Sequence, residues 1–338
     1  NQGAAPTAGS FTGISISGRV VTSGLGDIYM KALGGNGSSE RGISLQGSGS
    51  NSCRVASTGG PLLPGGSITL LGTGGASVSS TSYGVYLANQ YVTVESASGD
   101  ITLDGSTTST GSSPYGLVID DAIVQAMGSD PVNISITGEG SQVADLGSKI
   151  GVLVTGNSEI KAEKGSITII GTGGDLPPTN TTSDGNYGVL IQANAQILST
   201  GEDPLDAATI SVTGTAGVNG DDDHRGISIT GSSTKISTDA GDMTLTGTGG
   251  GSVGPGSINN SGIYFTSGVI ESTGAGDIKF RGTAGVDVAT ASNAGIVLTS
   301  TGTDIRTEDG TGTLTFEADQ INISTNTAHV FITAGTNE

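Results

Sequence analysis

Several residue types that build compact helical or disulfide-linked proteins are scarce in this chain. It has no tryptophan, aromatic residues make up 4% of it, charged residues make up 13%, and it contains one cysteine. A single cysteine excludes an internal disulfide framework. No run of eighteen apolar residues occurs, and glycine interrupts every stretch long enough to show the apolar period of a helix. We therefore expect neither a helical domain nor a membrane-spanning helix.

Positive charge is also scarce. The chain has 12 Lys and Arg residues against 31 Asp and Glu residues, which gives a formal net charge of −19. Proteins that bind nucleic acid carry a basic stripe, so we expect no nucleic-acid partner. The acidic balance keeps a strand-rich surface soluble and suits a calcium-containing exterior. We expect Cys53 to be an inert thiol in a loop, with an intermolecular bridge as the alternative.

Glycine is abundant, with 60 residues, and it marks a repeat. Each repeat opens with glycine, an apolar residue, any residue and a second apolar residue. Successive openings are 29 to 42 residues apart, which is typical of solenoids, propellers and arrays. The opening glycines are Gly13, Gly42, Gly84, Gly116, Gly151, Gly188, Gly226, Gly262 and Gly295.

Each repeat contains three strand signals. The first follows the opening glycine, the second is weaker, and the third alternates apolar, polar and apolar residues, as in Ile167-Thr168-Ile169. Most third strands end in Gly-Thr or Gly-Ser, where we expect glycine to supply the positive φ of a sharp corner. The second signal lies at Val20, Val55, Val92-Thr93-Val94, Ile123, Ile160-Lys161-Ala162, Ile197, Ile236, Ile270 and Ile305.

Three short strands in constant order describe one turn of a coil. Stacked turns pair like strand with like strand in parallel, and parallel crossovers are right-handed in nearly all proteins. The sequence therefore predicts an all-β fold, a right-handed parallel β-helix solenoid with three strands per rung, nine full rungs and a partial tenth. No composition shift divides the chain, so residues 1–338 form one domain. A β-propeller is the weaker alternative, because its blades need four antiparallel strands.

Loop lengths and chain ends indicate partners. The segments between a third strand and the next opening glycine are longest at residues 170–187 and 246–261, and solenoid insertions often gather on a binding face. Residues 1–10 are small and polar, without the charged segment and apolar core of a secretion signal. Because neither end has an amphipathic cap, we expect a piece of a longer rod or a subunit that self-associates, end to end or laterally.

One phrase recurs across the chain. Gly-Ser/Asp-Ile-Thr-Leu-x-Gly-Thr-Gly-Gly occurs, with small variations, at residues 66–75, 165–174 and 241–250. These repeats resemble those of filamentous-haemagglutinin-type bacterial exoproteins, over nearly the whole chain. The resemblance implies a secreted β-helical adhesin or surface filament, extracellular or on the bacterial cell surface, whose partner is a glycan or a cell-surface receptor. That family's amino-terminal secretion domain is not matched, and no catalytic residue carries over.

Sequence motifs for catalysis are weak throughout. The two histidines, His224 and His329, lie far apart in sequence, and no nucleophile elbow, zinc-protease motif or phosphate-binding loop occurs. Glycoside hydrolysis requires two carboxylates flanking a bond, but the outward middle positions of the third strands hold no carboxylate. We expect the protein not to be an enzyme, with a carbohydrate-active β-helix of the polysaccharide lyase or hydrolase kind as the alternative.

Two acidic sets are candidate cation sites. Asp221, Asp222 and Asp223 lie in one loop and could supply oxygen ligands for calcium, although EF-hand spacing is absent; a solvated acidic loop is the competing interpretation. The second set stands just before the third strands, and we expect it to cap backbone amides at a corner instead of binding metal. Its members are Asp27, Ser67, Asp100, Asn133, Ser166, Thr209, Asp242, Asp277 and Thr313.

Two rows of outward-facing residues, one on the third strands and one on the first strands, are candidate ligand-binding surfaces. Threonine recurs in the third strand, which suggests ice binding, but the next outward position is irregular and weakens that alternative. The middle position of the first strand is apolar in four consecutive repeats, at Tyr86, Val118, Leu153 and Leu190. An exposed apolar stripe marks a partner site, although a loop of the same chain that covers it is an equal alternative. We predict a rigid extracellular structural or adhesive rod, without a resident cofactor.

Overall fold

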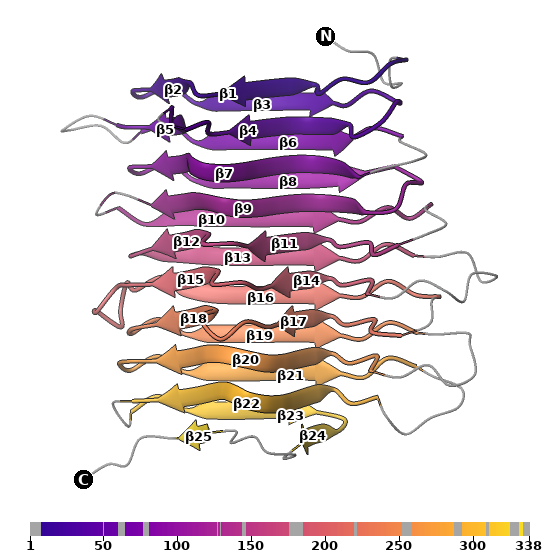
Figure 1. Cartoon of the computed structure of the whole chain (residues 1–338). Helices are drawn as coiled ribbons and strands as arrows, with labels where there is room; N and C mark the ends of the chain where they lie inside the picture. Colours follow the sequence, from indigo (N-terminus) through magenta and orange to yellow (C-terminus); the bar gives the residue numbers. More distant parts are fainter. Residues whose placement is uncertain are drawn as a thin grey trace.

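The computed structural model describes residues 8–49, 51–59, 65–76, 81–126, 128, 130–143, 147–175, 185–219, 222–251, 259–286, 293–308, 311–324 and 331–333. Every regular secondary-structure element in these residues is a β-strand, and the chain winds the strands into a stack of turns (Figure 1). In the described part of the chain, no helix is long and apolar enough to cross a membrane. The all-β solenoid predicted from the repeat is confirmed.

The strands form three sets, one for each segment of a turn. First strands are β1 (Ile14–Ser17), β4 (Arg41–Gln46), β7 (Ser82–Ser96), β9 (Pro114–Ala126), β11 (Val152–Thr155), β14 (Val189–Ile191), β17 (Ile227–Ile229), β20 (Ile263–Ser272), β22 (Ile296–Thr307) and β24 (Ile321–Ser324). Second strands are β2 (Val20–Ser23), β5 (Cys53–Ser57), β12 (Glu159–Ala162), β15 (Gln196–Ser199), β18 (Lys235–Thr238) and β25 (Phe331–Thr333). The long strands β7, β9, β20 and β22 continue around the corner and supply both segments of their turns.

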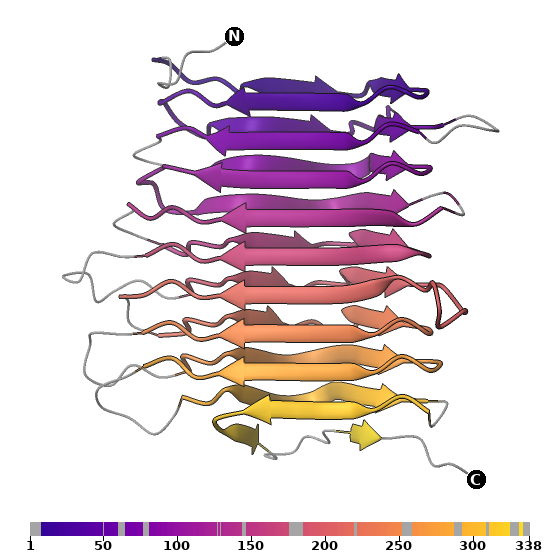
Figure 2. The same cartoon turned by 180° about the vertical axis from the view of Figure 1, so that it is seen from behind.

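Third strands form a sheet of their own. They are β3 (Ile28–Leu33), β6 (Ile68–Gly74), β8 (Ile101–Thr107), β10 (Val132–Glu139), β13 (Gly165–Thr172), β16 (Thr209–Thr215), β19 (Met243–Thr248), β21 (Ile278–Thr283) and β23 (Leu314–Ala318). These nine strands pair in chain order, and first and second strands together form a sixteen-stranded sheet. In Figure 2 the nine-stranded sheet runs from right to left in front while the chain descends, and the other sheet returns behind it, so the coil is right-handed.

The core lies between the two sheets. Parallel pairing aligns identical positions of successive turns, for example Ile134 with Ile167 and Ile167 with Ile210. Because side chains alternate across a strand, the outer members of each apolar triplet point inward and stack into continuous columns. Ile167, Ile169, Val189 and Ile227 are all fully buried in this cluster. Ladder hydrogen bonds and these apolar columns hold the rod together.

The repeated glycines allow the two sheets to approach each other closely. A Cβ atom on Gly171, at the end of a third strand, would lie 2.0 Å from the carbonyl oxygen of Gly188, which opens the next first strand. Five other turns with the same motif place that contact at 2.0–2.2 Å. The predicted reason was wrong, since Gly171 and its counterparts do not adopt positive φ. Any side chain here would force two backbones apart, which is why the repeat keeps glycine at both positions.

The second-strand prediction was off by one residue in two turns. Val21 pairs with Val55, so Val21 is the inward residue, and Val20 is 58% exposed. Likewise Val94 pairs with Val124, so Val124 is the inward residue and Ile123 lies in the outward column. A strand has a side-chain period of two, so one extra corner residue exchanges the two faces. The sequence pattern alone did not reveal the length of these corners.

Candidate binding surface

The predicted apolar row is aligned by the backbone as expected. Tyr86 pairs with Val118, Val118 with Leu153, and Leu153 with Leu190, each on the outer side of the sixteen-stranded sheet. The row ends on both sides at serine, because Tyr86 also pairs with Ser44 and Leu190 pairs with Ser228. Four neighbouring turns therefore carry apolar side chains on the side of the sheet that faces away from the core.

Three of the four residues of the row are buried, which favours the alternative of a covered row over an exposed stripe. Val118 is 3% exposed, and Leu153 and Leu190 are each 8% exposed. Together with Ile150 they form a second hydrophobic cluster, separate from the core, against which Tyr83, Tyr86, Tyr115 and Tyr187 pack. The physical reason is that Tyr83, Tyr115 and Tyr187, each three residues before a member of the row, pack against this cluster. Partners would meet the half-buried tyrosines instead of the aliphatic row.

We call Tyr83, Tyr86, Tyr115 and Tyr187 the tyrosine surface. The Tyr83 and Tyr86 rings stack with centroids 4.9 Å apart and planes at 22°, and the Tyr115 centroid lies 5.7 Å from that of Tyr83. Sequence reasoning missed three members, although a signal was present. Tyrosine directly precedes the opening glycine in three repeats, at Tyr83-Gly84, Tyr115-Gly116 and Tyr187-Gly188.

Arginine lies at both ends of the tyrosine surface. The guanidinium carbon of Arg41 is 4.1 Å from the ring centroid of Tyr86 and 5.6 Å from that of Tyr83. That of Arg225 lies 3.4 Å from the Tyr264 centroid and 5.9 Å from the Tyr187 centroid. Such stacking is attractive because the ring face carries negative electrostatic potential. The arginines fix the orientation of the rings at the two ends.

Burial raises the pKa of two phenols of this surface, those of Tyr86 and Tyr115. At Tyr86, the nearby Arg41 lowers the pKa and Asp120 raises it further. A protonated phenol both donates and accepts hydrogen bonds beside an apolar ring face. The surface can therefore contact ligands that combine flat apolar faces with hydroxyl or amide groups, as sugar rings do.

The acidic loop was the predicted calcium site. Asp221 lies outside the described residues. Asp223 accepts a hydrogen bond from Nη2 of Arg225 at 2.6 Å, and the carbonyl of Asp222 accepts one from the amide of Gly185. The described part of the chain contains no cluster of three or more residues that could hold a metal ion. Asp223 thus neutralises the arginine that stacks on Tyr264.

His224 follows that loop and is fully buried. Burial is the main cause that lowers its pKa from 6.5 to about 4; Lys149 adds to the effect, and Asp223 and Asp222 oppose it. Its backbone amide donates to Oδ1 of Asn260 at 3.0 Å, and the amide of Asn260 donates to Oδ1 of Asn293 at 3.1 Å. His224 therefore stands in a buried column where Asn260 and Asn293 cap backbone amides, while its own ring nitrogens have no hydrogen-bond partner among the described residues. The other histidine, His329, lies outside the described residues.

The polar column before the third strands also caps amides, as predicted. Oδ1 of Asp27 accepts from the amide of Ser67 at 2.8 Å, and Oδ1 of Asp100 accepts from the amide of Asn133 at 2.9 Å. Oδ1 of Asp242 accepts from the amide of Asp277 at 3.0 Å. Each acidic side chain thus accepts a hydrogen bond from a backbone amide at the corner of the following turn. Cys53 lies in β5, not in a loop, and its buried thiol is free, with a pKa raised by burial.

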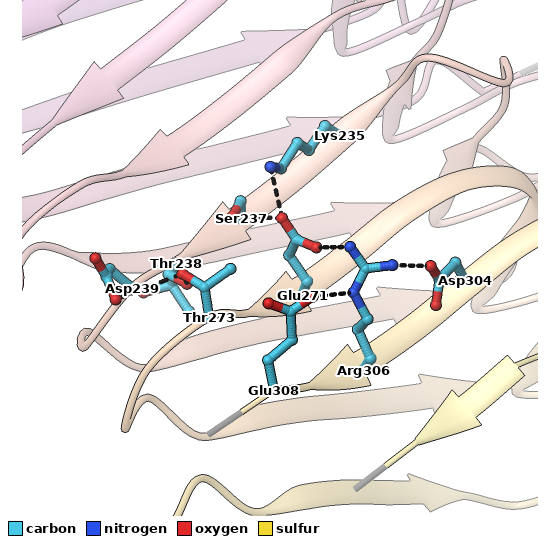
Figure 3. A network of polar contacts seen from close by, with 9 residues as sticks. All are labelled: Lys235, Ser237, Thr238, Asp239, Glu271, Thr273, Asp304, Arg306 and Glu308. Atoms are coloured by element: carbon cyan, nitrogen blue, oxygen red, sulfur yellow. Dashed lines mark hydrogen bonds and ion pairs between the residues drawn. The ribbon is translucent and has the colours of Figure 1, made fainter. Parts of the chain in front are cut away.

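Ion pairs join successive turns on the outside of the second strands (Figure 3). The carboxylate of Glu271 lies 2.5 Å from Nζ of Lys235 and also pairs with Arg306, and its side chain is 2% exposed. Burial alone raises the pKa of Glu271, but the hydrogen bond and charge of Lys235 and the charge of Arg306 outweigh it and lower that pKa. Arg306 also contacts Asp304 and Glu308. The Glu271 carboxylate thus links its own turn to the preceding turn through Lys235 and to the following turn through Arg306.

Hydroxyl groups cover the outside of the nine-stranded sheet. Pairing aligns one unbroken row of Thr69, Thr102, Ser135, Thr168, Ser211 and Thr244. The neighbouring outward row is broken by Leu71, Asp104 and Ile170, as the sequence indicated. An ice-binding face needs two regular rows, so the broken row argues against that alternative.

Two hollows open on the described surface. One of about 520 Å³ is lined by acidic residues of the loop before β16, where Lys164 and Asp206 pair at 2.6 Å. The other, of about 430 Å³, lies at the corner between first and second strands. Its lining residues are Gly47, Gly49, Asn89, Gln90, Tyr91 and Asp121.

No protein-family model, curated protein or solved structure matches this chain.

Proposed function

We propose that this chain is part of an extracellular adhesive rod, at a bacterial cell surface, that binds glycans through the tyrosine surface. The observation that carries the proposal is the position of that surface. Four half-buried tyrosines lie on the side of the rod away from the core, over an apolar cluster of their own, with arginines at both ends. Aromatic side chains of this kind are enriched at binding sites, because one end is apolar and the other forms hydrogen bonds.

The rest of the molecule supports a scaffold role. The nine-stranded sheet repeats without interruption and presents short hydroxyl side chains, and a parallel ladder of this kind makes a stiff support. The resemblance to filamentous-haemagglutinin-type repeats and the charge of −19 both favour a secreted protein. Self-association of such rods, end to end or laterally, is compatible with this function and would present several tyrosine surfaces together.

Binding without catalysis is favoured over a carbohydrate-active enzyme. Glycoside hydrolysis needs one carboxyl group to donate a proton and a second to act as base or nucleophile. The buried carboxylate of Glu271 is held by Lys235 and Arg306, and the pairing lowers its pKa, which is unsuited to an acid. Glu95 is similarly engaged by Arg54 and by Gln125. We propose that the protein releases no sugar from the glycans it binds.

Binding to immobilised glycans tests this function. The wild-type chain and the double variant Tyr83→Ala with Tyr115→Ala are applied to the same glycan array, with Tyr29→Ala as control. Tyr29 is 63% exposed but lies on the nine-stranded sheet. We expect the double variant to bind at least about tenfold more weakly, since loss of two ring contacts costs about 1.4 kcal/mol or more. The control should bind as the wild type does.

The same samples distinguish adhesion from catalysis. Each bound glycan is incubated with the wild-type protein, and new reducing ends are measured over time. We expect none to appear. Release of reducing ends, or equal binding by the wild type and the double variant, would contradict the proposed function.

A further inference from the structure

The corner hollow beside the tyrosine surface has the chemistry of a sugar subsite. It exists because β7 bulges outward. Ala88 pairs with Asp120 and Val92 with Ala122, so Asn89, Gln90 and Tyr91 face the single residue Asp121. The bulge pushes these three side chains into solvent and leaves the hollow of about 430 Å³ between them and the preceding turn.

Tyr91 is held in an unusual conformation at this bulge. Its φ is +82°, in the left-handed region, and its side chain is 56% exposed. Aromatic residues rarely adopt positive φ, and an exposed tyrosine contributes little packing that would offset the strain. Gly47 permits this geometry, since a Cβ atom there would lie 2.3 Å from the carbonyl oxygen of Gln90. The fold therefore keeps a strained tyrosine open to solvent.

Hydrogen-bonding groups surround the ring. Oδ1 of Asp121 accepts from both the backbone amide and Nδ2 of Asn157, each at 2.8 Å, which fixes the carboxylate. Nδ2 of Asn89 reaches the carbonyl of Gly47 at 3.5 Å. The second oxygen of Asp121 remains an acceptor, and the side chain of Gln90 is exposed and can both donate and accept. A ring face with oriented acceptors and an amide matches the C–H face and hydroxyl groups of a pyranose.

The charge of the hollow selects among sugars. No lysine or arginine lines it. Asp120 stands next to Asp121, and its pKa is raised by burial and by the charge of Asp121. A uronic acid, sialic acid or sulfated sugar would meet negative charge without a compensating cation, whereas the hydroxyl groups of a neutral hexose donate hydrogen bonds to the carboxylate.

The hollow continues the tyrosine surface around the corner. Tyr86 and Tyr91 lie on the same strand, with Asp120 on the next strand between them in register. Five residues of extended chain span at most about 16 Å, more than one sugar ring. We propose, on the basis of the glycan-binding function above, that this hollow binds one unit of a neutral hexose oligosaccharide whose neighbouring units contact the tyrosine surface.

Substitution of Tyr91 by glycine tests the subsite without endangering the fold. Glycine accepts positive φ, so Tyr91→Gly should melt at a higher temperature than the wild type while it loses the ring. Ala193→Gly is the matched control, because Ala193 also has a left-handed φ, +54°, at the same corner of another turn but does not line the hollow. Asp121→Asn keeps the acceptor for Asn157 and removes the charge.

The four proteins are titrated by calorimetry with cellopentaose, maltopentaose, mannopentaose and a pentamer of galacturonic acid. For the neutral pentamer that the wild type binds best, we expect Tyr91→Gly and Asp121→Asn to weaken binding tenfold or more and Ala193→Gly to leave it unchanged. Binding of that pentamer by Tyr91→Gly at wild-type affinity would overturn the subsite, as would preference of the wild type for the acidic pentamer.

The subsite and the proposed function can fail separately. If Tyr83→Ala with Tyr115→Ala abolishes binding while Tyr91→Gly does not, the tyrosine surface binds glycan and the hollow does not. If the wild type binds no glycan on the array or in solution, the proposed function is wrong and the subsite falls with it.

Discussion

The two sheets of this solenoid are built from the same repeat but differ in regularity. In the nine-stranded sheet, third strands follow one another in chain order, and inward positions pair apolar residue with apolar residue across turns. The sixteen-stranded sheet is interrupted at the corner between its first and second strands, where register shifts occur in β7 and β20. Five of the described non-glycine residues with positive φ, Asn89, Tyr91, Asp121, Ala193 and Asn194, lie at this corner.

The difference shows where a repeat can vary without losing the fold. Each third strand is constrained by the apolar columns inside and by the glycine contact at its end, so changes there disturb two neighbouring turns. The corner of the other sheet lies outside both constraints. Its backbone can bulge and present large side chains, and Tyr91 and the hollow beside it are examples. Candidate binding groups therefore gather on the sixteen-stranded sheet, at this corner and around the start of its first strands.

The largest expected effect comes from the regular sheet. Replacing the fully buried Ile167 with Asp places a charge in the apolar column without a partner. We expect a loss of at least about 4 kcal/mol in the free energy of unfolding. The control is Thr168→Asp, the outward neighbour, which should cost less than about 1 kcal/mol. Denaturant unfolding measures both; equal effects of the two variants would contradict the inward and outward assignment.

A second variant tests the contact between the sheets. Gly171→Ala puts a Cβ atom 2.0 Å from the carbonyl oxygen of Gly188, so two backbones must separate. We expect a loss of about 3 kcal/mol, at the upper end for overpacking. Gly24→Ala is the control, because Gly24 has no positive φ and no atom within 4 Å of the added methyl. If thermal melting shows equal stability for the two variants, glycine is not required by close approach.

The smallest expected effect is a pH dependence of the free energy of unfolding, caused by His224 just before the first strand β17. His224 has a pKa lowered to about 4, so between about pH 6.5 and 4 the unfolded chain binds a proton that the folded protein does not. Stability therefore falls as the pH drops through this window, by about 2 kcal/mol between pH 7 and 5. We expect His224→Asn to remove this loss, because asparagine occupies the equivalent position at Asn260.

Carboxylates change stability at lower pH and can be separated from this effect. Glu271 and Glu317 have lowered pKa values, so their contributions are present above the ordinary value of 4.5 and are lost as the pH falls below it. They act in the wild type and in His224→Asn alike. Urea unfolding at pH 7, 6 and 5 gives the difference between the two proteins. A difference that stays constant with pH would show that His224 is not the group responsible.

The sequence by itself determined the solenoid. A glycine-opened repeat and apolar alternation fix which residues pair and which face inward in the first and third strands, because parallel stacking places like positions on one another. For the same reason the alignment of Tyr86, Val118, Leu153 and Leu190 and the amide-capping column at Asp27 and Asp100 were predictable. These properties depend on residue period alone, and a repeat displays its period.

Only the tertiary structure decided which outward side chains are covered, how closely the two sheets approach and where the strands bulge, because the residue period does not contain this information. Whether the apolar row is open or covered depends on side chains three residues earlier, such as Tyr83 and Tyr115, packing against it. The role of Gly171 depends on how closely two sheets approach, and the exposure of Tyr91 depends on a bulge that only the pairing partner reveals. These features depend on how side chains and segments of neighbouring turns pack against one another, which the residue period does not encode.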